Sequence, residues 1–404
     1  MSTARLADAP WLSDPSVAAL FDALDGDGAE TRFVGGAVRD ALSGRQVADI
    51  DFATTLSPAE TSRRLAAAGL KAAPTGLAHG TVTAVIDGRG FEITTLRQDV
   101  ATDGRHAVVA FTDDWRADAA RRDFTINAMS ADRVGAVYDY FGGAADLAAG
   151  CVRFVGVPAD RVREDYLRIL RFFRFHAWYG AGEIDAAGLA ACKNGVEGLV
   201  NVSSERVRME LLRLLSAPDP TATLAAMAAA DILPALFGVE ARDIRSLIAV
   251  ERSVDAPPDP ILRLAALAPL RAEVLAERLR LSRAEASALA KLAPPWTGLG
   301  ETAADWRRAL HRLGCAAFRR RALLAAASGE TERLRGRLQA SEAWTPRRLP
   351  VNGRDLINAG LTHGPEVGAM LQALEDYWLE RDFAPGRDEL IDEAGARRAG
   401  KKNA

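Results

Sequence analysis

The sequence contains little that would indicate secretion or attachment to a membrane. Its three cysteines, Cys151, Cys192 and Cys315, are odd in number and widely spaced, which argues against a disulfide framework and against a structural zinc site. No segment reaches about 18 consecutive uncharged apolar residues. Asp8 and Asp14 interrupt the N-terminal stretch, so no signal or transit peptide is expected either. We therefore expect a cytoplasmic protein with no membrane partner.

The sequence also has little excess of charge of either sign. The 404 residues carry a net charge of −3 with an isoelectric point near 6.1, so a nucleic-acid site would need a local concentration of arginine. The five histidines, His79, His106, His176, His311 and His363, lie far apart. Because an isolated histidine is more often packed or solvated than a ligand, none of them is assigned catalytic work.

What the sequence does contain divides it into two kinds of segment. In the first part, stretches such as "GTVTAVID" and "GFEITTL" alternate polar with β-branched or aromatic residues between Gly and Asp turns, a pattern typical of strands. In the rest, apolar residues recur with helical spacing. These patterns predict an α+β protein, with a small mixed head followed by an all-helical remainder. The expected parts are a helical lead-in (1–30), the head (31–157), a neck (158–216), a body (217–335) and a tail (336–404).

Two aspartates stand one residue apart in a predicted strand, "ADIDFAT". Residues two apart on a strand face the same side, so Asp49 and Asp51 are expected to project together while Ile50 and Phe52 turn toward the core. Glu92, in a second predicted strand, could join them. Neighbouring carboxylates repel one another unless cations neutralise them, and three such acids can hold two metal ions roughly 3.5–4 Å apart for phosphoryl transfer. This interpretation predicts Mg²⁺ bound by Asp49 and Asp51; the alternative is a solvated turn or strand-edge pair.

A glycine turn precedes the acids. In "RFVGGAVRD" a predicted strand leads through Gly35 and Gly36 into the first turn of a predicted helix. Glycines let a ligand approach the backbone, and the free N–H groups of a helix start attract anions. A triphosphate could therefore bind there, with Arg39 as its counter-charge. Arg39 could instead pair structurally with Asp40 or Asp49.

A family resemblance joins these features. The segments "VGGAVRD", "DIDFAT", "RRDFTINAM", "EDYLRILRFFRF" and "ERVRMELLRLL" follow one another in this order between residues 32 and 216. The series resembles the class II tRNA nucleotidyltransferases, which comprise the CCA-adding enzymes and their bacterial poly(A) polymerase relatives. The resemblance implies a nucleotidyltransferase head like that of polymerase β. It also implies that C, C and A are added to the 3′ end of tRNA from CTP and ATP.

The resemblance assigns roles to individual residues. The catalytic carboxylates would be Asp49, Asp51 and Glu92, and the nucleotide would be bound by Gly35, Gly36, Arg39, Arg122, Asp123, Asp165, Arg168, Arg171 and Arg174. Among these, Arg122 would contact phosphate and Asp123 the ribose, where a 2′-hydroxyl needs an acceptor. The loop at 97–107 would be a flexible element that helps the enzyme change from adding C to adding A.

The last four of these residues are spaced three apart. Asp165, Arg168, Arg171 and Arg174 are therefore expected to form one slowly drifting stripe on a helix, which the resemblance identifies as a protein template and which is otherwise a solvated face. Cytosine and adenine both present an amino donor beside a ring-nitrogen acceptor. A carboxylate with an adjacent guanidinium would accept them and reject U or G, whose groups would stay unpaired at roughly 1–3 kcal/mol each.

Several alternatives stay open at this stage. Poly(A) polymerases of this class share most motifs, but Val34 precedes the Gly-Gly where they are expected to carry a basic residue, which favours CCA addition. An A-only-adding enzyme and a non-catalytic RNA-binding module are further alternatives, the latter disfavoured by the intact acids. The basic segment 306–324 could grip tRNA phosphates or form an ordinary solvated face. In the tail segment 352–371, a helix expected to begin near Gly364 and Pro365 could hold a phosphate or belong to a helix–helix turn.

Overall fold

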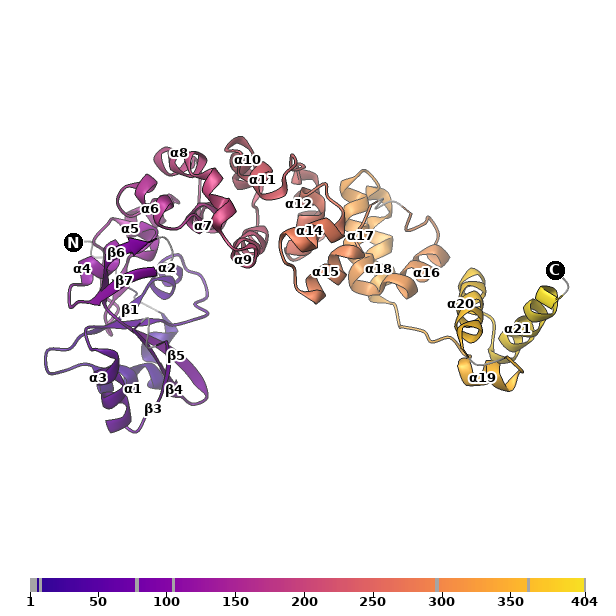
Figure 1. Ribbon diagram of the computed structural model, residues 1–404, viewed down its shortest axis with the longest axis horizontal. Helices are drawn as coiled ribbons and strands as arrows, with labels where there is room; N and C mark the ends of the chain where they lie inside the picture. Colours follow the sequence, from indigo (N-terminus) through magenta and orange to yellow (C-terminus); the bar gives the residue numbers. More distant parts are fainter. Residues whose placement is uncertain are drawn as a thin grey trace. The chain divides into compact units, whose positions relative to one another are not determined.

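The protein is described by a computed structural model that covers residue 6 and the ranges 9–76, 80–103, 106–294, 298–361 and 364–402. The chain divides into two compact units, residues 1–241 with 278–280, and residues 242–277 with 281–404. Figure 1 shows the strands in the first unit and helices throughout the second. Within the described ranges, no helix is long and apolar enough to cross a lipid bilayer.

A seven-stranded sheet forms the head, in the order β3-β4-β5-β2-β1-β8-β9. Its strands are β1 (Thr31–Val34), β2 (Phe52–Thr54), β3 (Lys71–Gly76), β4 (Thr81–Ile86), β5 (Arg89–Thr95), β8 (Ser130–Ala131) and β9 (Val137–Tyr138). β2 pairs with β5 in parallel, while the other described neighbours pair antiparallel. The sheet is therefore mixed, and the predicted α+β class with a mixed head and a helical remainder is confirmed.

One face of this sheet is covered by α1 (Pro15–Leu24) and α3 (Pro58–Ala67). The predicted N-terminal helix is thus part of the head's hydrophobic core. At its centre, Phe52 lies 5.1 Å from Phe33, 5.6 Å from Phe21 and 6.2 Å from Phe91, measured between ring centroids. Because aromatic side chains bury large apolar areas, this cluster fixes the strand that follows the acidic pair.

A separate two-stranded sheet, β6 (Arg97–Asp103) with β7 (His106–Phe111), occupies the segment predicted to be a flexible loop. The backbone of residues 97–103 pairs antiparallel with that of 106–111, so this segment is a hairpin between its described residues. Gly104 and Arg105 lie outside the described residues, as do His79 and His363. The role of the hairpin in nucleotide choice stays a prediction.

The neck follows as a series of helices that pack against the head. α7 (Leu167–Tyr179) packs against α9 (Ser204–Leu215). The Phe154 and Phe172 rings stack at 5.4 Å, and Phe124 lies 5.2 Å from Phe175. The helix expected to carry Asp165 together with Arg168, Arg171 and Arg174 is wrong, because α6 (Pro158–Glu164) ends just before Asp165, whose φ of −157° and ψ of 107° are extended.

The remaining helices complete the two units. In the first unit they are α2 (Gly36–Leu42), α4 (Trp115–Ala120), α5 (Gly143–Ala148), α8 (Ala186–Asn194), α10 (Thr221–Ala229) and α11 (Ile232–Phe237). Along the rest of the chain they are α12 (Arg245–Ser253), α13 (Pro260–Leu267), α14 (Ala272–Arg278), α15 (Arg283–Ala290), α16 (Ala303–Leu313), α17 (Cys315–Ala327), α18 (Leu334–Glu342), α19 (Gly353–Asn358), α20 (Pro365–Glu380) and α21 (Arg387–Lys402). α20 begins where the sequence predicted. The finer division of the chain into head, neck, body and tail stays a prediction.

The basic segment 306–324 is largely neutralised within the second unit. His311 lies 3.0 Å from Glu375, and Arg320 lies 2.6 Å from Asp259. Three further ion pairs join this segment to acids elsewhere in the second unit: Arg307–Asp382, Arg312–Asp376 and Arg319–Glu342. These pairs favour the structural interpretation of the segment over a grip on phosphates.

We predict that Phe52→Ala lowers the free energy of unfolding of the first unit by roughly 3–5 kcal/mol, because Phe52 is fully buried among three other aromatic rings. Urea denaturation followed by circular dichroism measures the loss. Phe111→Ala is the matched control, since half of that side chain is exposed, and it is expected to change stability by less than about 1 kcal/mol. Equal losses in the two variants would contradict the assigned core.

Candidate active site

The acidic cluster is assembled by the pairing of two strands. The Val34 amide donates to the Asp51 carbonyl at 3.0 Å, which extends the β1·β2 pairing one residue beyond β2. In the parallel β2·β5 pair, Phe52 is opposite Ile93, so the residues just before them, Asp51 and Glu92, are neighbours. Phe52 and Ile93 are buried, whereas Asp51 and Glu92 are exposed. Both carboxylates therefore leave the same face of the sheet, as the sequence pattern predicted.

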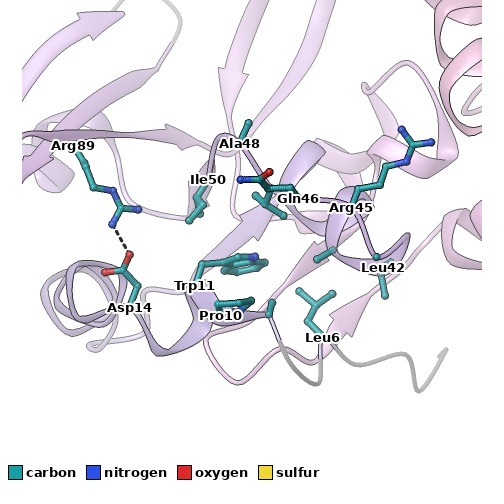
Figure 2. A pocket seen from close by; sticks show the side chains of 14 residues that line it. Leu6, Pro10, Trp11, Asp14, Leu42, Arg45, Gln46, Ala48, Ile50 and Arg89 are labelled. Atoms are coloured by element: carbon teal, nitrogen blue, oxygen red, sulfur yellow. Dashed lines mark hydrogen bonds and ion pairs between the residues drawn. The ribbon is translucent and has the colours of Figure 1, made fainter. Parts of the chain in front are cut away.

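Ile50, between the two aspartates, and Ala48, just before them, line a cavity instead. Figure 2 shows Ala48 and Ile50 on the wall of a cavity of about 790 Å³ that also contacts Trp11 and Leu42. Asp49 does not line this cavity and is exposed. Ile50 thus turns away from the acids as predicted, whereas Asp49 lies before β2, which begins only at Phe52, so the common projection of Asp49 and Asp51 stays a prediction. The cavity lies behind the acidic segment and is not the place where the carboxylates meet solvent.

The charges of Asp49 and Glu92 act on the carboxyl group of Asp51. Partial withdrawal from water raises the pKa of the Asp51 carboxyl, and the negative charges of Glu92 and Asp49 raise it further, while Arg122 lowers it. Within the described ranges, no three carboxylate, histidine or cysteine side chains converge closely enough to hold a metal ion. The carboxylates are therefore near enough to repel one another, but they do not converge on one point. Carboxylate oxygens are the kind of ligand that a hard divalent cation prefers.

Two guanidinium groups border the glycine turn. Gly35 has a φ of +64°, and a Cβ atom added to it would lie 2.9 Å from Arg122 Nη1. A Cβ atom on Gly36 would lie 3.6 Å from Arg39 Nη2. The missing side chains thus leave room beside two positive charges, where the phosphates of a nucleotide could bind. The turn leads directly into α2, as predicted.

Arg122 is held in place by a residue that the sequence analysis did not single out. Its Nη2 lies 3.3 Å from the buried Asp118 of α4, and its Nη1 donates to the Asn127 carbonyl at 3.3 Å. Although burial opposes it, the guanidiniums of Arg122 and Arg121 hold the pKa of Asp118 below its ordinary value. The four-residue spacing of Asp118 and Arg122 is the sequence pattern that could have predicted this ion pair.

Arg39 makes the pairing with Asp40 that the sequence left open as an alternative. Its Nε donates to Asp40 at 2.9 Å, Nη2 donates to the same carboxylate at 3.1 Å, and Nη1 donates to the Asn127 side chain at 2.6 Å. Three of its five N–H groups are used in these bonds, which leaves two for a ligand. The structural pairing and a phosphate contact are therefore compatible.

A chain of polar contacts continues from Asn127 into the neck. Its amide donates to Asp123 at 3.0 Å, and Arg171 of α7 contacts the other oxygen of that carboxylate at 2.6 Å. Although burial opposes it, Arg171 and Asn127 lower the pKa of Asp123. Arg171 also lies 3.4 Å from the buried Glu210 of α9, which holds Arg174 as well. Glu210 was missed by the sequence analysis, although it lies within the quoted segment "ERVRMELLRLL".

The predicted base-selecting residues lie where α6 gives way to α7. Asp165 is in the extended junction, so the predicted four-residue stripe is wrong and only its three arginines share a helix. Arg206 of α9 holds Asp165 at 2.7 Å, a contact that the sequence did not indicate. Arg168 donates to the Arg161 carbonyl at 3.1 Å and pairs with Glu164. Asp165 and Arg168 are thus oriented by separate partners.

Comparisons with known proteins place this site in a family. Residues 31–153 match the model described as the poly A polymerase head domain, and residues 183–240 match the one described as a probable RNA and SrmB-binding site of polymerase A. The mitochondrial CCA tRNA nucleotidyltransferase 1 is 37% identical in Danio rerio and 35% in Homo sapiens, and both matches cover 90% of this chain and 86% of the relative. The solved CCA-adding enzyme of Bacillus stearothermophilus, in complex with CTP, is 26% identical with a TM-score of 0.77, covering 98% of this chain and 100% of that one.

We predict that Asp51→Asn raises the melting temperature of the metal-free protein. A carboxyl whose pKa is raised by folding favours the folded state below its unfolded pKa, and this contribution is lost as pH rises through the folded pKa. At neutral pH, removal of the charge relieves repulsion from Glu92 and Asp49. A divalent cation is expected to raise the melting temperature of the wild type but not that of the variant.

Differential scanning fluorimetry with EDTA, and then with added Mg²⁺ or Mn²⁺, measures both effects. Asp113→Asn, which removes another exposed acid of the head, is the control and is expected to behave like the wild type. The assignment of the cation site fails if Asp51→Asn gains as much from the cation as the wild type does.

Proposed function

The chain belongs to the family of CCA-adding tRNA nucleotidyltransferases, and we propose that it adds C, C and A to the 3′ end of tRNA from CTP and ATP. The observation that carries this proposal is the arrangement of charge in the first unit. There Asp51 and Glu92 emerge side by side, and Arg122, which borders the glycine turn, acts electrostatically on Asp51. Such an arrangement suits nucleotidyl transfer, in which carboxylates and the phosphates of a nucleotide must lie close to one another beside positive charges.

We propose that the terminal 3′-hydroxyl of the tRNA attacks the α-phosphorus of the nucleotide and that pyrophosphate leaves. Arg39 and Arg122 would bind the β- and γ-phosphates from either side of the glycine turn. Asp123 would accept from the ribose 2′-hydroxyl. One oxygen of its carboxylate already accepts from Phe124 and Asn127, and the other is contacted by both Nε and Nη2 of Arg171, so the 2′-hydroxyl would share an oxygen that already has partners.

The acids of this site would bind Mg²⁺. Asp49 and Asp51 supply oxygen ligands of the kind that Mg²⁺ prefers, with Glu92 as the supporting carboxylate. Bound divalent ions would stabilise the charge on the reacting phosphates and lower the pKa of the attacking hydroxyl. The raised pKa of Asp51 supports this role, since burial and, after it, the charges of Glu92 and Asp49 disfavour the ionised carboxylate, and a bound cation would offset both effects.

Nucleotide choice would be made by Asp165 and Arg168. The Asp165 carboxylate would accept from the exocyclic amino group of C or A, and the Arg168 guanidinium would donate to the adjacent ring nitrogen. Glu164 pairs with Arg168, and Arg206 pairs with Asp165. Arg171 and Arg174 are engaged by Asp123 and Glu210, which favours a supporting role for them.

A poly(A) polymerase is the second candidate, because the head matches a model described with that name. The two activities differ in whether CTP is used. An A-only-adding enzyme differs in the same way. A cytoplasmic location stays a prediction, and the two vertebrate relatives described above carry the word mitochondrial in their names.

Nucleotide incorporation provides the test. The protein is incubated with tRNAs that end before the first C, before the second C and before A, with each of the four nucleotides in turn. We predict the addition of C, C and A in succession, followed by a stop. Uncontrolled addition of A would reject the CCA assignment in favour of a poly(A) polymerase, and failure to use CTP with addition of a single A would favour an A-only-adding enzyme.

Two variants separate the chemical step from nucleotide choice. Asp51→Ala is expected to lower every addition by at least about 10³-fold, because it removes a ligand of the reacting phosphates. Asp165→Ala is expected to retain transfer while incorporating U or G more readily. If Asp165→Ala kept its choice of C and A, the base-selecting role would have to move to another residue.

A further inference from the structure

The end of α7 is fastened to α2 by its last residue, Tyr179. The Tyr179 hydroxyl donates to Asp40 Oδ1 at 2.6 Å, a length typical of a charge-assisted bond. The same Asp40 carboxylate accepts from both Nε and Nη2 of Arg39. Tyr179 thus contacts, through one carboxylate, the arginine that borders the glycine turn.

The ring of Tyr179 also contacts cations directly. The Arg39 guanidinium lies 4.4 Å from the ring centroid, and that of Arg45 lies 4.6 Å from it. Cations at such distances are attracted to an aromatic face. Arg45 additionally donates to the carbonyl of Trp178. Arg45 is four residues before Asp49, so the end of α7 holds the segment that leads to the acids as well as Arg39.

The hydroxyl is protonated when it makes this contact. Burial raises the pKa of the Tyr179 phenol, and the bond to Asp40 raises it further, against the opposing charge of Arg39. The phenol is therefore a hydrogen-bond donor at neutral pH. The Asp40 carboxylate thus accepts hydrogen bonds from both Tyr179 and Arg39. In such a network each hydrogen bond strengthens the other.

We propose that Tyr179 is a positioning residue for the triphosphate: from the neck, it fixes the Arg39 guanidinium through Asp40 so that two N–H groups of Arg39 stay directed at the glycine turn. The inference rests on the proposed nucleotidyl transfer and adds to it a residue outside the reacting groups. It means that the neck contributes to phosphate binding as well as to base selection. Loss of the contact would weaken phosphate binding equally for CTP and ATP.

Tyr179→Phe tests the proposal, because it removes the hydroxyl and keeps the ring. The dissociation constant for inorganic tripolyphosphate, measured by isothermal titration calorimetry without tRNA, is expected to rise about three- to ten-fold, as for loss of a bond to a charged group acting indirectly. In steady-state addition, KM for CTP and for ATP is expected to rise by the same factor. The KM for tRNA and the choice of C and A are expected to stay unchanged.

Two further variants control for a merely structural effect. Tyr166→Phe, at the start of the same helix, removes a hydroxyl that makes no hydrogen bond to the described residues, and it is expected to match the wild type. In an Asp40→Asn background, Tyr179→Phe is expected to add no further loss, because the two residues act through one contact. Independent, additive losses in this cycle would overturn the proposed route.

The outcomes also separate this proposal from the assigned activity. A wild-type protein that adds no C or A to tRNA rejects the proposed function, whatever Tyr179 does. If the wild type adds C and A but folded Tyr179→Phe binds tripolyphosphate as tightly as the wild type, the positioning role of Tyr179 is wrong and the function stands.

Discussion

The parallel pairing of β2 with β5 is the constraint on which the site depends. Because Phe52 is opposite Ile93 and both are buried, the preceding Asp51 and Glu92 must emerge together on the solvent face. The aromatic cluster around Phe52 fixes that register, since a shift by one residue would exchange the buried and exposed sets. The repulsion between the carboxylates therefore follows from the core packing, and it is the physical reason for proposing a cation site on this surface.

A series of polar contacts connects the head to the neck. Arg39, Asn127, Asp123 and Arg171 form one continuous series of hydrogen bonds and ion pairs that crosses from α2 of the head to α7 of the neck. Buried networks of this kind are costly unless every member is paired, so they tend to fix one arrangement of the elements that they join. Arg171 lies on the same helix, α7, as Arg168, so this series connects the helix of the proposed phosphate contact Arg39 with the helix of a proposed base-selecting residue. The contact of Tyr179 with Asp40 adds a further connection between the same two helices.

The sequence predicted the features that depend on local periodicity and missed those that depend on distant partners. The alternation in "ADIDFAT" predicted an exposed Asp51 before a buried Phe52, because the period of a strand is two. The spacing of three at Asp165 suggested one helix, and no proline or glycine stands there to signal the break that the structure has. The bond from Tyr179 to Asp40 joins residues 139 positions apart, so no local pattern could indicate it. The strand β6 was expected to be a loop because the family resemblance implied a flexible element at 97–107.

The central claim is that the acids of the head and the base-selecting residues of the neck act on one bound nucleoside triphosphate. Crystals of the protein grown with CTP and Mn²⁺ would test it directly through the anomalous scattering of manganese. The account predicts manganese peaks between the Asp49 and Asp51 carboxylates and the phosphates, with the amino edge of the same cytosine facing Asp165 and Arg168. Manganese bound away from these acids, or a cytosine whose amino edge faces other residues, would contradict it.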